Sequence, residues 1–179
     1  MANHEIVIAG FGGQGLLFSG KVLAYAGLIE GRELSWLPSY GPEMRGGTAN
    51  CNVILSDTPV GSPIVEKPDI LMVMNTPSLD KYEDAVVPGG KIFIDSTMIT
   101  RKVTRDDVEV YYVPSTSMAM ENGLKGLANM ILLGAIVEKT NCIADDSLET
   151  ALHKVIPARK ANLFDTNMTA IGLGREYVK

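Results

Sequence analysis

The chain has 179 residues, of which 46% are hydrophobic and 21% are charged, and its formal net charge at pH 7 is −5. This composition can supply the hydrophobic core of one domain, and we expect a single domain over residues 1–179. The negative charge argues against nucleic acid or an anionic membrane as the main partner, because both attract basic patches.

Strands are predicted from short apolar runs and helices from longer amphipathic or apolar segments between turn residues. The expected strands are 6–9, 34–37, 48–56, 69–74, 91–94 and 108–113. The expected helices are 16–30, 77–85, 118–139, 147–156 and 158–177. This order predicts an α/β fold with a Rossmann-like parallel or mixed sheet, helices on both faces and a helical C-terminal part.

Polar residues follow several of the expected strands: Asn75, Asp95 with Ser96, and Ser115 with Thr116. In open α/β sheets, ligands bind in the crevice outside the carboxyl ends of the strands. We therefore expect these residues to lie at one edge of the sheet, together with two glycine-rich loops.

The first loop carries Gly10, Gly12 and Gly15, which match G-x-G-x-x-G between the first strand and the first helix. This placement gives a tight turn and points a helix N-terminus at an anion, so Gly12, Gly13, Gln14 and Gly15 are candidate binding residues. A dinucleotide fingerprint also needs an acid at the end of the second strand, which here reads Ser-Trp-Leu-Pro. Three readings stay open: binding of NAD or FAD, which the missing acid disfavours, a turn that serves close packing, and a loop that holds another phosphate or carboxylate.

The second loop spans residues 38–47, and its two prolines and three glycines predict irregular structure. Arg45 lies beside two glycines, so its guanidinium can reach a carboxylate or a phosphate. The alternative is a surface loop in which Arg45 pairs with Glu43. Candidate binding residues in and near this loop are Ser39, Tyr40, Glu43, Arg45, Gly46 and Gly47, with Asn75 at the end of a neighbouring strand.

No catalytic residue and no metal site is predicted. Cys51 and Cys142 are far apart and form no C-x-x-C motif, and no Ser/His/Asp or Cys/His pattern involves His4 or His153. The N-terminal residues lack the pattern of a signal peptide, and the longest apolar run, 130–137, is shorter than the ~20 residues of a membrane span. We expect a cytoplasmic protein with no membrane partner.

Residues 9–15 (Ala-Gly-Phe-Gly-Gly-Gln-Gly) and 38–49 (Pro-Ser-Tyr-Gly-Pro-Glu-Met-Arg-Gly-Gly-Thr-Ala) closely resemble the γ subunit of 2-oxoacid:ferredoxin oxidoreductases. The resemblance covers nearly the whole chain and is closer to the 2-oxoglutarate and branched-chain members than to the pyruvate members. Further matching residues are Ser62, Pro63, Pro68, Asp69, Met74, Asn75, Gly89, Gly90, Asp95, Ser96, Asn129, Met130, Leu133, Gly134 and Ala135.

The resemblance implies a subunit of an enzyme that oxidatively decarboxylates a 2-oxoacid, with 2-oxoglutarate favoured, to an acyl-CoA and reduces ferredoxin. It implies thiamine diphosphate, Mg²⁺ and iron–sulfur clusters in the complex, and α, β and ferredoxin-like δ subunits as partners. This chain has neither a Gly-Asp-Gly segment nor a cysteine set, so we expect it to hold none of these cofactors alone. Its two loops are expected to face partner subunits and to hold coenzyme A phosphates.

Two other classes stay open. One is a stand-alone nucleotide-binding oxidoreductase or regulatory module. It is disfavoured because the second strand does not end in the acidic residue that would bind a ribose. The other is an interaction scaffold in which the glycine turn is only structural. It is disfavoured by the composite loop that carries Arg45. Residues 127–137 are apolar on almost every side, which predicts a buried helix first and a subunit interface second. A large apolar interface would make the subunit self-associate when it is expressed alone.

Overall fold

The computed structural model describes residues 2–39 and 48–179. Within these ranges six strands form one mixed sheet in the order β2-β3-β1-β4-β5-β6. The neighbours β1, β4, β5 and β6 are parallel, and β3 runs antiparallel to both β1 and β2. The strands are β1 (His4–Phe11), β2 (Glu33–Ser39), β3 (Thr48–Ser56), β4 (Ile70–Val73), β5 (Lys91–Asp95) and β6 (Glu109–Val113).

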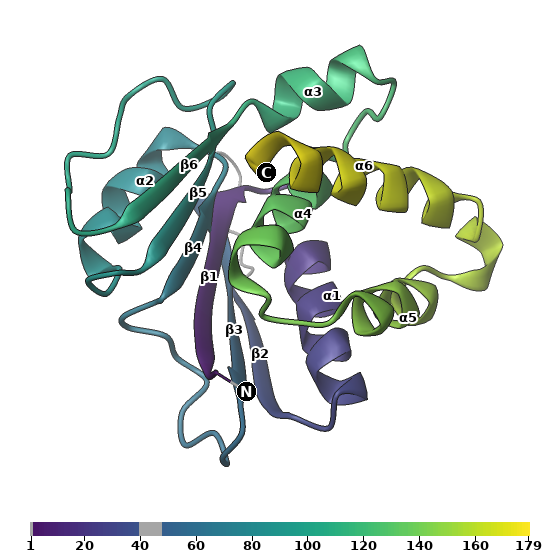
Figure 1. The fold of residues 1–179 in the computed structure, drawn as a ribbon, viewed down its shortest axis with the longest axis horizontal. Coiled ribbons are helices and arrows are strands. Elements are labelled where there is room, and N and C mark those ends of the chain that lie inside the picture. The colour runs from purple at the N-terminus through teal and green to yellow at the C-terminus, as the bar shows by residue number, and fades with distance from the viewer. Residues whose placement is uncertain (1, 40–47) are drawn as a thin grey trace.

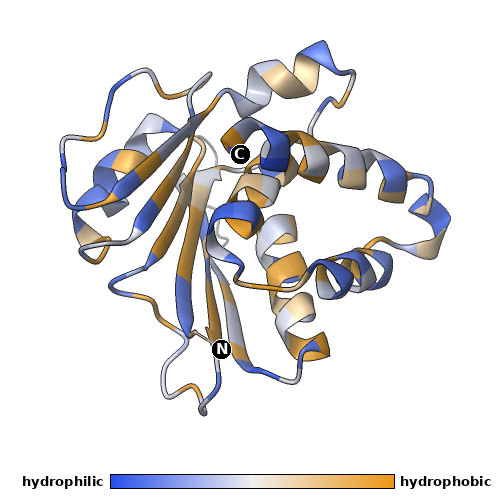
Figure 2. Cartoon of the chain, viewed as in Figure 1, coloured by the Kyte–Doolittle hydropathy of each residue, from blue (hydrophilic) through white to orange (hydrophobic). Residues whose placement is uncertain are grey.

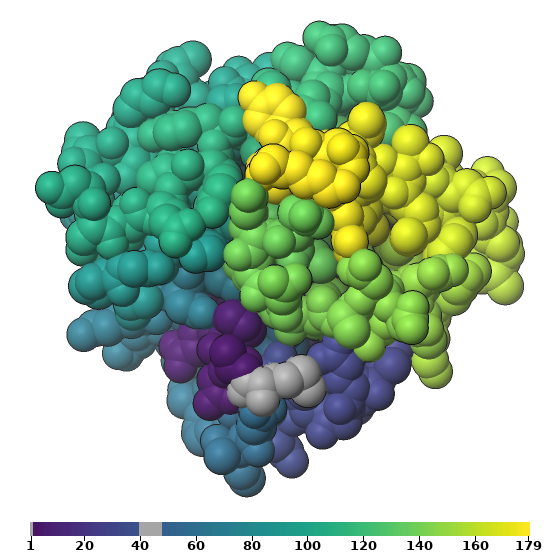
Figure 3. Space-filling model, viewed as in Figure 1, coloured from purple at the N-terminus to yellow at the C-terminus, as the bar shows by residue number. Residues whose placement is uncertain are grey.

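Helices cover both faces of this sheet, as predicted (Figure 1). Helices α1, α4, α5 and α6 form a thick layer on one face, and α2 lies on the other. The C-terminal helices form a continuous surface on their side of the molecule (Figure 3). Their bounds are α1 (Leu16–Ile29), α2 (Thr76–Tyr82), α3 (Ser115–Glu121), α4 (Ala128–Thr140), α5 (Asp145–Val155) and α6 (Leu163–Val178), with single turns η2 (Glu83–Ala85) and η3 (Ala158–Lys160).

Strand β1 is central and shows why its sequence is a continuous apolar run. Ile6 and Ile8 pack into the core under the thick helical layer, whereas Val7 and Ala9 pack into the core on the opposite face. Because successive side chains of a strand point to opposite faces, both faces need apolar residues when both are covered. Apolar residues accordingly gather on the strands and on the helix sides that face them (Figure 2). None of the described helices combines the length and apolar character of a bilayer-spanning segment.

Strand β2 continues through Pro38 and Ser39, so the prediction of irregular structure from residue 38 onward was wrong at these two positions. Pro38 pairs with Cys51 of β3. Proline lacks the backbone N–H that a central strand needs, but β2 is an edge strand with a partner on one side only.

The single helix predicted over 118–139 is wrong, because α3 and α4 are separate helices. Between them Gly123 and Gly126 have φ angles of 67° and 82°, a left-handed conformation that ends a helix and that glycine adopts without a Cβ clash. The last predicted helix also begins later, since η3 precedes α6. The break between α3 and α4 is important because the connection lines a cavity described below.

Helices α4 and α6 lie backbone to backbone. A Cβ atom at Gly134 of α4 would overlap the carbonyl oxygen of Ile171, and one at Gly174 of α6 would overlap that of Ile131. Helix α4 is buried without a break from Asn129 to Val137, between the sheet and α6, which confirms the burial predicted from its apolar sequence.

We predict that Gly174→Ala destabilises the fold by roughly 1–3 kcal/mol, because the added methyl group forces α6 away from α4. Gly172→Ala is the matched control, since a Cβ there meets no atom within 4 Å in the same helix. That control should be neutral or more stable by up to about 1 kcal/mol, from the higher helix propensity of alanine. Urea unfolding followed by circular dichroism measures both, and equal midpoints for the two variants would contradict the packing account.

Candidate functional site

The carboxyl ends of β1, β4, β5 and β6 meet at one edge of the sheet because these strands are parallel. The glycine turn follows β1 at this edge, Asn75 follows β4, and Asp95 ends β5. Ser39 and Thr48, the described residues that flank 40–47, lie at the same edge, since Ser39 pairs with Asn50 and Thr48 pairs with Phe11.

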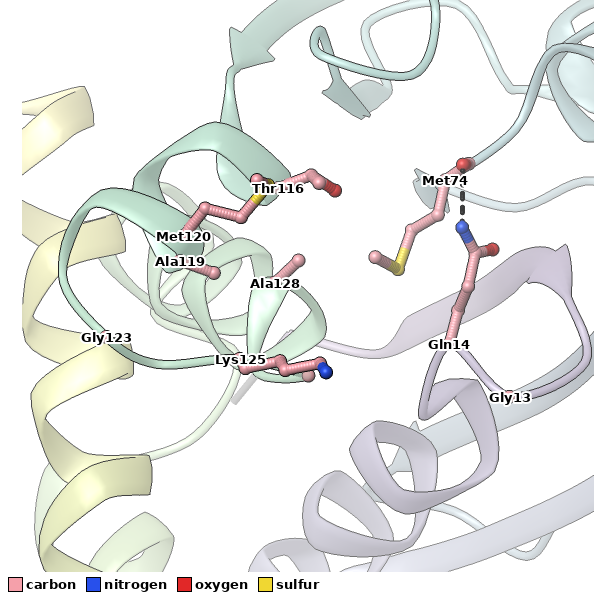
Figure 4. A pocket seen from close by; sticks show the side chains of 10 residues that line it. Gly13, Gln14, Met74, Thr116, Ala119, Met120, Gly123, Lys125 and Ala128 are labelled. Atoms are coloured by element: carbon pink, nitrogen blue, oxygen red, sulfur yellow. Dashed lines mark hydrogen bonds between the residues drawn. The ribbon is translucent and has the colours of Figure 1, made fainter.

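The glycine turn is held in shape by Gln14. Its side-chain Oε1 accepts a hydrogen bond from the backbone N–H of Phe11 at 2.6 Å, and its Nε2 donates to the carbonyl of Met74 at 3.2 Å (Figure 4). Gly13 and Gly15 have φ angles of 88° and 75°, which glycine adopts more readily than residues with a Cβ. The turn is therefore tied to the end of β4 as well as to its own strand.

Helix α1 begins directly after this turn with Gly15 at its N-cap, and no side chain caps it among the described residues. The first N–H groups of a helix have no partner inside the helix, and they carry a partial positive charge. Gly12 and Gly13 are exposed beside them. The turn therefore offers the backbone geometry that binds phosphate or carboxylate.

Asn129 at the start of α4 fixes the other side of the turn. Its Nδ2 donates to the carbonyl of Gly15 at 2.9 Å and to the hydroxyl of Ser19 at 3.1 Å. The contact is so close that a Cβ at Gly15 would lie 2.5 Å from Nδ2. Glycine at this position is needed both for its φ angle and for the approach of α4.

A cavity of about 550 Å³ opens between the turn and the α3–α4 connection (Figure 4). Its lining residues are Gly13, Gln14, Met74, Thr116, Ala119, Met120, Gly123, Lys125, Gly126 and Ala128. The side chains of Met74 and Lys125 point into it from opposite walls. Lys125 is the cation of this lining, and it has no hydrogen-bond or ion-pair partner within residues 2–39 and 48–179.

A second hollow of about 290 Å³ shares Gly13 with the cavity. It is lined by Phe11, Gly12, Gly13, Gly15, Leu16, Leu17, Phe18 and Ala49. It therefore contains the first turn of α1 and reaches the beginning of β3. Gly13 of the glycine turn therefore lines both hollows.

The α3 wall of the cavity is anchored by the buried carboxylate of Asp95. Its Oδ2 accepts from the hydroxyl of Thr116 at 2.5 Å, and its Oδ1 accepts from the backbone N–H groups of Thr116 and Thr97 at 3.3 and 3.1 Å. Thr97 in turn bonds both the N–H and the hydroxyl of Ser117. The end of β5 thus caps the short helix α3, which has no side-chain cap from its own N-cap residue.

The residues proposed from sequence are placed as follows. The turn residues Gly13 and Gln14 line the cavity, and Ser39 is exposed at the end of β2. Asn75 is buried and caps α2, where its Oδ1 accepts from the N–H of Ser78 at 2.9 Å. Five further candidates lie outside the described residues: Tyr40, Glu43, Arg45, Gly46 and Gly47.

Sequence reasoning missed Lys125 and Met74 as lining residues. The signal that could have found Lys125 is the pair Gly123 and Gly126, which flank it inside a segment predicted as helix. Two glycines so close together favour a turn. Met74 carried no such signal, because in sequence it is one more apolar residue at the end of a buried strand.

The cysteines take no part in this edge. Burial raises the pKa of the Cys51 thiol to about 12 and that of the Cys142 thiol to about 11. Both thiols are therefore protonated at neutral pH, and a protonated thiol is neither a nucleophile nor a metal ligand.

Comparison with known proteins identifies the class. The chain matches the family model of pyruvate ferredoxin/flavodoxin oxidoreductase over residues 5–177, and it belongs to that family. Its fold resembles the γ subunit of a keto/oxoacid ferredoxin oxidoreductase from Geobacter sulfurreducens, with a TM-score of 0.83, 29% identity and 98% of both chains covered. The resemblance inferred from the two loop sequences is thereby confirmed.

Two curated relatives give the particular subunits that it is similar to. It is 40% identical to ketoisovalerate oxidoreductase subunit VorA of Methanothermobacter thermautotrophicus, over 98% of this chain but only 36% of that protein. It is 36% identical to 2-oxoglutarate synthase subunit KorC of Methanocaldococcus jannaschii, over 98% of this chain and 94% of that protein. The chain thus spans nearly all of one relative and a fraction of the other.

We predict that Thr116→Val destabilises the protein by about 1–3 kcal/mol, because it removes the hydroxyl that bonds the Asp95 carboxylate. Thr116→Ser keeps that hydroxyl and should cost clearly less. Urea unfolding of both variants is the measurement. If valine and serine lower the midpoint equally, the bond to Asp95 does not hold the α3 wall.

Proposed function

We propose that this chain, as one γ-type domain, is the γ subunit of an enzyme that oxidatively decarboxylates a 2-oxoacid to an acyl-CoA and passes the electrons to ferredoxin. The observation that carries the proposal is the match to the KorC subunit along nearly its whole length. The same match favours 2-oxoglutarate as the substrate, because this chain spans 94% of the 2-oxoglutarate synthase subunit but only 36% of the ketoisovalerate oxidoreductase subunit.

The chemistry belongs to the partner subunits in this proposal. The sequence contains neither a Gly-Asp-Gly segment for magnesium-bound diphosphate nor a C-x-x-C motif for a cluster. Thiamine diphosphate, Mg²⁺ and iron–sulfur clusters would be held by α, β and ferredoxin-like δ subunits in the cytoplasm. This chain would contribute a wall of the coenzyme A site.

The glycine turn supports that role. Its exposed Gly12 and Gly13 favour a phosphate, as does the start of α1, which no side chain in the described part of the chain caps, and Gln14 keeps the turn in shape. We propose that Gly15, Ser39 and Asn75 complete this edge from the described residues. Tyr40, Glu43, Arg45, Gly46 and Gly47 would contact the same phosphates or the partner subunits.

We predict that tagged chain isolated from its native host brings down a complex that reduces a low-potential dye. Reduction should require coenzyme A, thiamine diphosphate and a 2-oxoacid, with 2-oxoglutarate turned over faster than pyruvate or ketoisovalerate. The measurement is dye reduction with each component omitted in turn. If the tagged chain is instead purified without partner subunits and binds a nucleotide tightly, the stand-alone nucleotide-binding module is supported.

We predict that Arg45→Ala raises the KM for coenzyme A in the assembled complex by about tenfold, as expected for one lost charge-assisted contact. Arg159→Ala removes the same charge from η3, in the C-terminal part of the chain, and should leave the kinetics unchanged. Steady-state kinetics at varied coenzyme A measures both variants. Unchanged kinetics for Arg45→Ala in a fully assembled complex would contradict the assignment of Arg45 to coenzyme A.

A further inference from the structure

The polar side chains of the 550 Å³ cavity are already engaged, with one exception. Gln14 uses one end of its amide on Phe11 within the glycine turn and the other on the carbonyl of Met74, and the hydroxyl of Thr116 is bonded to Asp95. Much of the remaining wall is apolar and includes Met74 and Met120. Among the described residues, the ammonium of Lys125 is therefore the polar side-chain group that this lining leaves available to a ligand.

The backbone around Lys125 is fixed by its neighbours. Leu124 before it is buried, and its N–H donates to the carbonyl of Ala119 at 2.8 Å. Leu127 after it donates to the carbonyl of Leu124 at 3.0 Å, which closes the turn between α3 and α4. The lysine stem thus starts from an anchored turn and extends into the cavity toward the side on which Gln14 and Met74 lie (Figure 4).

The exposed ammonium of Lys125, which has no protein partner among the described residues, lies beside apolar walls, and this combination favours a particular kind of ligand. The charge attracts an anionic group, and the methionine side chains favour an apolar or weakly polar body next to it. Lysine acts as a point charge on phosphate and does not need the bidentate geometry of arginine. The cavity fits a ligand with a flexible, largely apolar arm that ends in a phosphate.

We propose that Lys125 is a specificity-determining residue that binds a phosphate of coenzyme A, with the pantetheine arm lying in the cavity beside Met74. This inference rests on the proposed function, because it assumes that the assembled complex uses coenzyme A. It assigns that ligand to the hollow on the Lys125 side of the glycine turn. The 290 Å³ hollow beside Ala49 is the other candidate.

The test compares Lys125→Gln with the unaltered complex for coenzyme A, dephospho-coenzyme A and pantetheine, each as substrate or as competitive inhibitor of turnover. For coenzyme A we expect the KM to rise about tenfold and kcat to fall less than twofold, the pattern of a lost ground-state contact. Binding of pantetheine, which has no phosphate, should not change. An equal loss for coenzyme A and its dephospho form assigns the diphosphate, and a loss for coenzyme A alone assigns the 3′-phosphate.

Two variants control the result. Lys125→Arg keeps the charge and should recover most of the affinity, whereas Lys154→Gln removes an exposed charge from α5 and should behave as the unaltered protein. An unchanged KM for coenzyme A in Lys125→Gln, or an equal loss for all three ligands, overturns the assignment. A complex that shows no coenzyme A-dependent turnover before any substitution is made refutes the proposed function instead.

Discussion

Two hydrogen bonds from the amide of Asn129 join helix α4 to the glycine turn at Gly15 and to the first part of helix α1 at Ser19. They connect the first crossover of the sheet to the helical C-terminal part, and the bond to Ser19 is buried while the bond to Gly15 is partly buried. Helix α4 cannot move away easily, because its backbone lies against α6 at Gly134 and Gly174. The distance between the turn and the α3–α4 connection, and with it the width of the cavity, depends on this link.

Within residues 2–39 and 48–179, the edge combines fixed backbone with the charge of Lys125, which has no protein partner there. The side-chain atoms of Gln14 hydrogen-bond within the turn and to the end of β4, and those of Asp95 hydrogen-bond to α3. Both residues therefore shape the site rather than contact a ligand. Among the described residues, the start of α1, which no side chain caps, and the ammonium of Lys125 remain as the positive features of the two hollows. The role proposed above, a wall of the coenzyme A site, rests on these features.

Local patterns in the sequence predicted most elements, and the exceptions have specific causes. Strand β3 has the predicted limits, 48 to 56, because its β-rich run is bounded by turn residues on the side of Asp57. Pro38 belongs to a strand only because β2 lies at the edge of the sheet, and strand order is not encoded in a local pattern. Gly123 and Gly126 end α3 through their φ angles, which outweighed the helical pattern on either side.

By itself the sequence determined the α/β order, the glycine turn between β1 and α1, and the family, because each depends on residues close together in the chain. Only the tertiary structure decided that Lys125 faces Met74 across a cavity and that Asn129 closes the turn at Gly15. Those contacts join segments far apart in sequence, and they arise from how α4 packs against α1 and α6. No local periodicity carries that information, since it reports which side of an element is buried but not which element covers it.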